Sequence, residues 1–195
     1  MAPADPARPA HRPSAREAML AAAEAHLGAD GTLTLDSAAR AAGVTKPGLM
    51  YHFATKEELL AAVLERITER YEREMLAEVA VMTGENPGEI SAEQRVLAYL
   101  DWACRADLSA ADLVIFADPH LRVALTERWQ GQIERWLLVP ADAPAPRRAR
   151  LLAVRLMADG LWFDRASGLL ETSADEAPAL RTLAEGVLVE GRGAA

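Results

Sequence analysis

The chain has 195 residues, of which 51% are hydrophobic, and a formal charge of −8 at pH 7, so it can bury a core and form one to two domains. It contains no apolar run near the ~18 residues that a membrane-spanning helix needs, and prolines at positions 3, 6, 9 and 13 interrupt the apolar centre expected of a secretory signal. Cys104 is the single cysteine. An internal disulfide and a cysteine-based zinc site are therefore excluded, and we expect a cytoplasmic protein.

The charge is unevenly distributed along the chain. Residues 1–56 hold six Lys and Arg against five Asp and Glu, whereas the other 139 residues hold 15 against 24. Both lysines, Lys46 and Lys56, lie in the first segment, as do three of the four histidines. Because phosphate contacts need positive charge, this distribution is typical of a molecule that touches DNA at one end only.

The hydrophobic pattern predicts an all-α fold of about nine helices. Apolar residues recur every four positions in several segments, and sustained strand-like alternation is absent from the sequence. The predicted helices span residues 15–27, 35–42, 46–52, 56–82, 91–106, 110–117, 119–138, 146–169 and 175–190. Capping boxes mark four of the starts, at Ser14 with Glu17, Thr55 with Glu58, Ser91 with Gln94 and Ser173 with Glu176.

The same pattern predicts three regions. Residues 1–13 form a Pro/Ala/Arg tail that we expect to be disordered. Residues 14–55 form a small N-terminal domain, and residues 56–195 form a helical domain to which helix 56–82 connects. The tail arginines Arg8 and Arg12, with Arg16, allow a second interpretation as a basic arm for the DNA minor groove.

The segment from Thr34 to Phe53 predicts a helix-turn-helix. Thr34 caps a short helix, and Gly43 ends it where the backbone must turn left-handed. Thr45 caps the next helix at once, and Pro47 falls in its first turn, where a missing N–H is no loss. Two short helices joined this way place the second one in the major groove. An ordinary helical hairpin is the alternative interpretation.

That placement assigns candidate DNA contacts. Lys46 can reach a guanine edge or a phosphate, and Pro47 with Gly48 offers a close approach to thymine methyl groups. Phosphates can accept from tyrosine, histidine and threonine side chains and from a lysine at the start of the fourth helix. The candidate DNA-binding residues are Thr34, Thr45, Lys46, Pro47, Gly48, Tyr51, His52 and Lys56. For Lys56, a solvated lysine at a helix start is the alternative.

These residues resemble the tetracycline-repressor (TetR) family of one-component regulators. The resemblance covers about residues 14–65 and is carried by the run from Ala42 to Lys46, by Leu49, and by the run from His52 to Leu59. It implies a helical effector-binding domain, a homodimer, and a repressor that a small molecule releases from a palindromic operator. Two positions depart from the family pattern. Ala38 replaces a larger aliphatic residue, and Met50 stands at the usual aromatic position, so the aromatic DNA contact is open between Met50 and Tyr51.

A homodimer is also expected on physical grounds, because one short recognition helix reads few base pairs whereas two read a palindrome. The predicted interface consists of helices 146–169 and 175–190, each with an apolar stripe and one glycine, Gly160 and Gly186. Helix 56–82, ~40 Å long at 1.5 Å per residue, is the expected lever between the two domains.

All four tryptophans lie in the second domain, where aromatic residues can line an effector cavity. The candidate pocket residues are Tyr99, Trp102, Phe116, Trp129, Trp136, Met157, Trp162 and Phe163, with plain core packing as the alternative for each. We expect Asp159 to pair with Arg155 one turn earlier, and Cys104 to behave as a buried small hydrophobe.

No cofactor or metal is predicted, because His120 has no second ligand at a suitable spacing. An all-helical enzyme is a rival hypothesis, but the sequence has no nucleophile–base pair, phosphate loop or metal motif to support it. A ligand-independent DNA-binding module is the other alternative.

Overall fold

The computed structural model describes residues 14–83, 90–169, 173 and 176–189, and the predicted tail 1–13 lies outside them. The described residues are helical without any strand, which confirms the all-α prediction. The elements are α1 (Ala15–Asp30), α2 (Leu35–Ala41), α3 (Lys46–Met50), α4 (Lys56–Thr83), α5 (Ala92–Arg105), the 3-10 helix η1 (Ala110–Phe116), α6 (Arg122–Leu137), α7 (Ala145–Ser167) and α8 (Ala177–Val189).

Side-chain caps fix several helix starts, as the sequence predicts. Ser91 Oγ accepts from the N–H of Gln94, whose side chain accepts from the N–H of Ser91 in return. The start of α4 is similar, since Thr55 Oγ1 accepts from the N–H of Glu58 at 3.1 Å. The Glu58 carboxylate accepts from the N–H of Ala54 at 2.8 Å. Local hydrogen bonds therefore explain where these helices begin.

Two helix boundaries differ from the prediction by three residues, and the others differ by at most two. The first helix does not end at residue 27 but continues to Asp30, and Gly31, at φ 68°, ends it by donating to Leu27 O at 2.9 Å. Gly28 lies inside this helix. A Cβ atom added at Gly28 would lie only 3.0 Å from Oγ of Ser109, so the glycine makes room for that side chain. The sixth α-helix starts at Arg122, three residues later than predicted.

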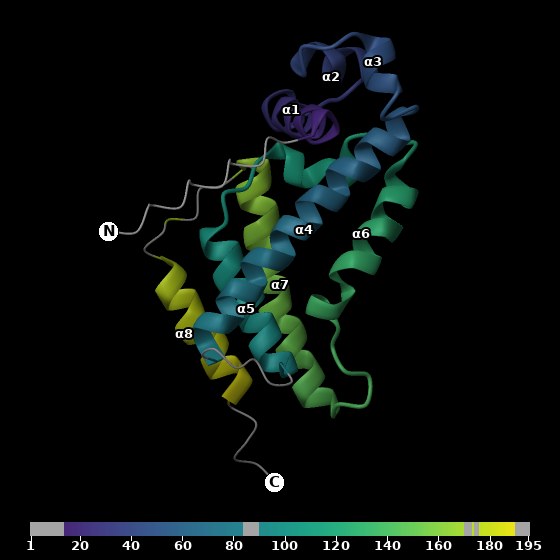
Figure 1. Ribbon diagram of the computed structural model, residues 1–195. Coiled ribbons are helices and arrows are strands. Elements are labelled where there is room, and N and C mark those ends of the chain that lie inside the picture. Colours follow the sequence, from purple (N-terminus) through teal and green to yellow (C-terminus); the bar gives the residue numbers. More distant parts are fainter. Residues whose placement is uncertain (1–13, 84–89, 170–172, 174–175, 190–195) are drawn as a thin grey trace, which may run out of the picture.

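Helix α4 runs the length of the molecule and joins its two ends (Figure 1). Helices α1 to α3 gather around its start, and α5, α6 and η1 pack along the rest of it. Helix α7 packs on α5, and α8 packs on α5 and α7. One hydrophobic core extends from Met19 in α1 to Leu188 in α8. Along α4, Leu59, Leu60 and Met75 are fully buried in this core.

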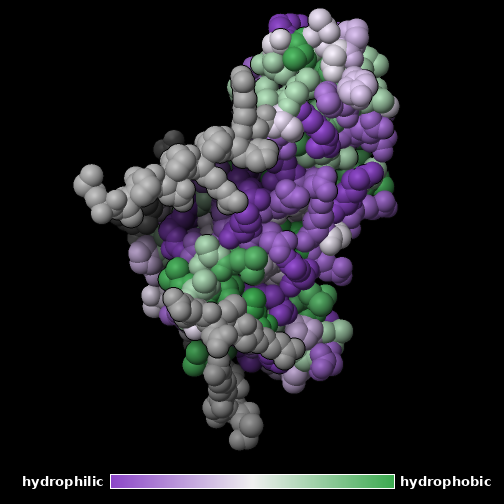
Figure 2. Space-filling model, viewed as in Figure 1, coloured by the Kyte–Doolittle hydropathy of each residue, from purple (hydrophilic) through white to green (hydrophobic). Residues whose placement is uncertain are grey.

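The surface is mostly polar. Figure 2 shows a hydrophilic middle and a group of apolar side chains over α8. None of the helices in the described ranges combines the length and the apolar composition that a membrane span requires.

Candidate nucleic-acid interface

The turn between α2 and α3 has the predicted geometry. Gly43 adopts φ 66°, a left-handed conformation that favours glycine. The N–H of Val44 donates to Ala39 O at 3.0 Å, and the N–H of Gly43 donates to Arg40 O at 3.1 Å. These bonds satisfy the last carbonyls of α2 and reverse the chain. The two helices therefore form a compact helix-turn-helix.

Helix α3 is anchored on one side and open on the other. Thr45 Oγ1 accepts from the N–H of Gly48 at 3.2 Å, and Leu49 and Phe53 are buried in the core. Tyr51, by contrast, is 87% exposed, and Met50 is 40% exposed. The His52 ring stands edge-on to Tyr51, with centroids 5.1 Å apart. The anchored helix thus presents an exposed outer side.

The predicted DNA contacts all lie at the α1–α3 end of the molecule (Figure 1). Five are exposed, namely Thr34, Thr45, Lys46, Pro47 and Tyr51, and three are half-buried, namely Gly48, His52 and Lys56. Sequence reasoning missed Arg40, which is exposed in the last turn of α2. Arg16 does not belong to the tail, because it lies in α1 with its guanidinium 4.9 Å from the centre of the Phe53 ring.

Both lysines of this end are held by carboxylates. Lys46 Nζ lies 2.9 Å from Asp36 Oδ2 on α2, and both side chains are exposed. Lys56 Nζ lies 2.6 Å from Asp118 Oδ2, in the loop before α6. The hydrogen bond from Lys56, with a second from the N–H of His120, lowers the pKa of Asp118. This carboxylate is therefore charged at neutral pH and competes for Lys56 with any phosphate.

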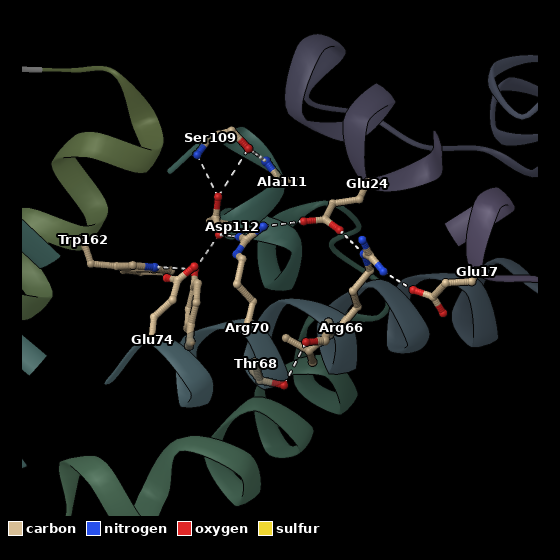
Figure 3. Close-up of polar contacts among 12 residues, drawn as sticks. Glu17, Glu24, Arg66, Thr68, Arg70, Glu74, Ser109, Ala111, Asp112 and Trp162 are labelled. Atoms are coloured by element: carbon tan, nitrogen blue, oxygen red, sulfur yellow. Dashed lines mark hydrogen bonds and ion pairs between the residues drawn. The ribbon is translucent and has the colours of Figure 1, made fainter. Parts of the chain in front are cut away.

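Arginines on α4 connect the N-terminal helices to the core (Figure 3). Glu24 of α1 accepts from Arg66 Nε at 2.7 Å and from Arg70 Nη1 at 2.7 Å. Arg66 also pairs with Glu17 of α1, and Arg70 also pairs with Asp112 of η1. Two arginines one turn apart thus bind α1 and η1 to the same side of α4.

The chain of polar contacts continues from Asp112 into α7. Tyr71 donates its hydroxyl hydrogen to Asp112 Oδ1 at 2.7 Å and accepts from Trp162 Nε1 at 2.9 Å. The second oxygen of Asp112 accepts from the N–H of Ser109 at 2.7 Å. Burial, together with the charge of Asp112, raises the pKa of Tyr71 well above its ordinary value. The Tyr71 hydroxyl therefore keeps its proton and joins η1, α4 and α7.

Half of the eight predicted pocket residues are buried in the core. Tyr99, Trp102, Trp136 and Trp162 are buried. The indole N–H of Trp102 donates to Glu74 at 2.6 Å, and the Tyr99 hydroxyl donates to Asp159 at 3.0 Å. Phe116 and Phe163 are exposed and Met157 is half-buried. The structure thus does not bring the eight predicted residues together around one cavity.

A groove of about 920 Å³ lies between α6 and α7, in the larger part of the molecule. It is lined by Trp129, Gln130, Ile133, Glu134, Leu137, Leu138, Val139, Ala145, Arg148, Ala149, Leu152 and Arg155. Trp129 is the one predicted pocket residue among them. Arg155 Nε lies 3.2 Å from Asp159 Oδ2, which confirms the predicted pair. The volume is within the ~300–1,000 Å³ usual for small-molecule sites.

Cys104 is half-buried and not fully buried as predicted. Burial and the nearby Asp101 raise the pKa of the Cys104 thiol, which disfavours the thiolate. Within the described ranges, no three His, Cys, Asp or Glu side chains group in a way that would hold a metal ion.

Two regions of the chain match known protein families. The family described as "Bacterial regulatory proteins, tetR family" matches residues 19–63, and "Tetracyclin repressor-like, C-terminal domain" matches residues 93–185. A comparison with curated proteins gave no match.

Several solved structures share the fold. The multidrug binding protein EbrR, complexed with imidazole, has a TM-score of 0.59 and 22% identity over 90% of this chain and 96% of that one. A TetR family member from Streptomyces coelicolor A3 has a TM-score of 0.58 and 20% identity over 90% of this chain and 98% of that one. GusR from Salmonella enterica has a TM-score of 0.56 and 17% identity over 92% of this chain and 98% of that one.

Proposed function

Because this chain belongs to the TetR family and is a DNA-binding transcriptional regulator, we propose that it is a repressor that a small molecule releases from a palindromic operator. One observation carries the DNA-binding part. The short helix α3 is anchored by Leu49 and Phe53 and presents an exposed outer side. Residues 14–55 are the reading domain, residues 56–195 bind the effector and form the dimer, and α4 connects them.

Individual contacts follow from the geometry of the reading domain. Lys46, Pro47 and Gly48, at the N-terminus of α3, face the base edges. Tyr51 takes the aromatic contact rather than Met50, since 87% of its surface is exposed against 40% for Met50. The phosphates are contacted by five side chains, namely Thr34, Thr45, Tyr51, His52 and Lys56.

The DNA contacts are tested by binding-site selection with the full chain, followed by titrations at several salt concentrations. Changing Lys46→Ala together with Lys56→Ala should weaken operator binding, and it should reduce the slope of log K against log salt by about one, because Lys56 neutralises a phosphate whereas Lys46 faces the bases. The matched control is Arg73→Ala, ~25 Å further along α4 at 1.5 Å per residue. Unchanged operator affinity together with an unchanged slope in the double variant would overturn the assigned DNA contacts.

The dimer is formed by α7 and α8 in this proposal. Exposed apolar residues follow one face of α7 at Leu156 and Phe163, and Leu183 is exposed on α8, which packs on α7. A Cβ atom added at Gly160 or Gly186 would have open space around it within the single chain, which leaves room for a partner helix. Isolated exposed leucines are common, but a stripe on two adjacent helices favours an interface.

Light scattering at micromolar concentration tests this interface. We expect a dimer for the unchanged chain and a monomer for the variant with Leu156→Asp and Leu183→Asp. The control is Val123→Asp on α6, since Val123 is at least as exposed but lies on another helix, and it should remain dimeric. A monomeric unchanged chain would contradict the proposal.

Release by an effector is supported by the groove and by the contacts of α4. The groove opens between α6 and α7, and Trp162 of α7 bonds to Tyr71 of α4. Arg66 and Arg70 of α4 in turn hold α1. A ligand that moves α7 would therefore act on the reading domain through α4, and a coupling of ~1–3 kcal/mol is sufficient. Operator DNA must then weaken ligand binding by the same factor.

A further inference from the structure

The charges in the groove are unusual for this protein. Its net charge is −8, yet the charged side chains that line the groove are two arginines of α7, Arg148 and Arg155, and one carboxylate of α6, Glu134. Asp159, which pairs with Arg155, is not among the lining residues, so both cations lie on the α7 side of the groove and the one lining carboxylate lies on α6. The α7 side therefore favours an anionic group over a cationic one.

Arg155 is held in place by residues behind the groove. Its Nε lies 3.2 Å from Asp159 Oδ2, and the other oxygen of Asp159 accepts from the buried Tyr99 hydroxyl at 3.0 Å. Burial and the nearby Asp159 raise the pKa of Tyr99 well above its ordinary value, so the hydroxyl stays a donor. With Nε engaged, the two terminal nitrogens of the guanidinium remain for a planar anion such as a carboxylate.

Arg148 is the second cation on this side of α7. It is exposed, and within the described part of the chain it forms no ion pair. Leu152 lies one turn after Arg148 and one turn before Arg155, and it also lines the groove. The α7 wall therefore places an apolar contact between two cations on one helix face.

The α6 wall contains three apolar residues beside Gln130 and Glu134, and one of the three has an indole N–H without a partner among the described residues. Trp129, Ile133 and Leu137 line the groove at intervals of four residues. Trp129 Nε1 is buried and has no hydrogen-bond acceptor among the described residues. A buried N–H donor normally has a partner, so an acceptor atom on a ligand would complete this site. The Trp129 ring, 6.2 Å from that of Trp162, offers a flat surface beside it.

We propose that the groove between α6 and α7 binds a flat aromatic molecule that carries one anionic group. The anion lies against Arg148 and Arg155, and the ring lies against Trp129 and Ile133. This assignment rests on the proposed function, since it names the chemical class of the effector.

Two fluorescent probes with the same ring system test this inference. 1-Anilinonaphthalene-8-sulfonate carries a sulfonate, and N-phenyl-1-naphthylamine is its uncharged counterpart. Each is titrated into the full chain without DNA. We expect the sulfonate probe to bind at least about tenfold more tightly than the neutral probe, because a hydrogen bond between charged groups is worth about a factor of ten or more.

Variants locate the anion. Arg148→Gln and Arg155→Gln should each weaken the sulfonate probe about tenfold, whereas Glu134→Gln should strengthen it. The matched control is Arg150→Gln, which removes an α7 arginine that does not line the groove. This variant should bind the sulfonate probe with unchanged affinity. Binding of the neutral probe should be the same in all of them. Arg148 is exposed, so its variant remains informative if Arg155→Gln fails to fold.

Three results would overturn the inference. The first is equal affinity for the two probes, and the second is sulfonate binding that neither arginine variant changes. The third is loss of the dimer in Arg148→Gln, since a second copy of the chain would then occupy the groove. Operator binding by the same variants without probe is measured separately. Normal operator binding with failed probe predictions rejects the ligand class alone, whereas failed operator binding by the unchanged chain rejects the proposed function.

Discussion

Lys56 Nζ lies 2.6 Å from Asp118 Oδ2, so a cation at the start of α4 is paired with a carboxylate in the loop that precedes α6. Lys56 is one of the proposed phosphate contacts, and α6 forms one wall of the groove. The Lys56 ammonium has three N–H donors, so a phosphate would either share it with Asp118 or displace that carboxylate. In both cases we expect the pair to weaken DNA binding.

We expect Asp118→Asn to strengthen operator binding. The amide keeps the shape of the carboxylate but does not hold the lysine by charge, so Lys56 becomes available to the phosphate. A partly exposed ion pair of this kind changes equilibria by up to about fivefold. Titration of the operator at low salt, where phosphate contacts are strongest, measures the change.

A double variant shows whether the effect passes through Lys56. In the Lys56→Gln background, Asp118→Asn should have no further effect on operator affinity, because the pair is already broken. An equal gain in both backgrounds would mean that Asp118 acts by repelling the DNA as a whole rather than by competing for Lys56.

Two glycines should respond in opposite directions to the same substitution. Gly43 has a left-handed backbone at φ 66°, and Gly131 lies in the middle of α6. Neither has a neighbour within 4 Å of an added Cβ. Gly43→Ala should lower the free energy of unfolding by about 1–2 kcal/mol because of its conformation, whereas Gly131→Ala should raise it by about 0.5–1 kcal/mol. Chemical denaturation measures both, and equal signs would contradict the assigned turn.

Asp112 should be the most sensitive polar residue of the core. Its side chain is 1% exposed and accepts from Arg70, Tyr71 and Ser109. Asp112→Ala leaves these donors without an acceptor and should lower the free energy of unfolding by about 3 kcal/mol, the lower end for a broken buried pair since Arg70 is partly exposed. Tyr71→Phe removes one hydroxyl and should cost about 1–2 kcal/mol.

The control for these variants is Glu185→Ala. It breaks a half-exposed pair with Arg181 on α8 and should change the free energy of unfolding by less than about 0.5 kcal/mol. A similarly small change for Asp112→Ala would show that the buried network does not stabilise the fold.

The thiol of Cys104 should react slowly. Because burial raises its pKa, with Asp101 adding to the effect, less thiolate is present near neutral pH than in a free cysteine. Each unit by which a pKa rises reduces the thiolate about tenfold. Alkylation by iodoacetamide should therefore be slow in the folded protein, accelerate as the pH rises, and become fast in denaturant. A folded-state rate equal to that of free cysteine would count against this account.

Local signals made the helix-turn-helix predictable. The cap at Thr45 and the left-handed turn at Gly43 depend on residues within five positions of each other, so the sequence reveals them directly. The pair of Arg155 with Asp159 was predictable for the same reason, since the residues lie one turn apart.

Contacts between distant segments were not predictable in this way. The indole N–H of Trp162 donates a hydrogen bond to Tyr71, 91 positions earlier, and that of Trp102 donates to Glu74 on another helix. These contacts place both tryptophans in the core. Composition alone does not separate such a tryptophan from Trp129, which lines the groove. Lys56 and Asp118 are 62 positions apart, so no sequence spacing marks their pairing. The groove likewise depends on the spacing between α6 and α7, which no local sequence signal reveals.

The continuous core from Met19 to Leu188 has a consequence for how the protein unfolds. Leu59 and Leu60, at the start of α4, are fully buried beside the reading domain, so that domain has no complete core of its own. We expect a single cooperative transition, with amides of α2 and α3 exchanging through the same global opening as those of α5. Any substitution that destabilises the larger domain then also reduces the fraction of molecules able to bind DNA, even when it touches neither DNA nor ligand.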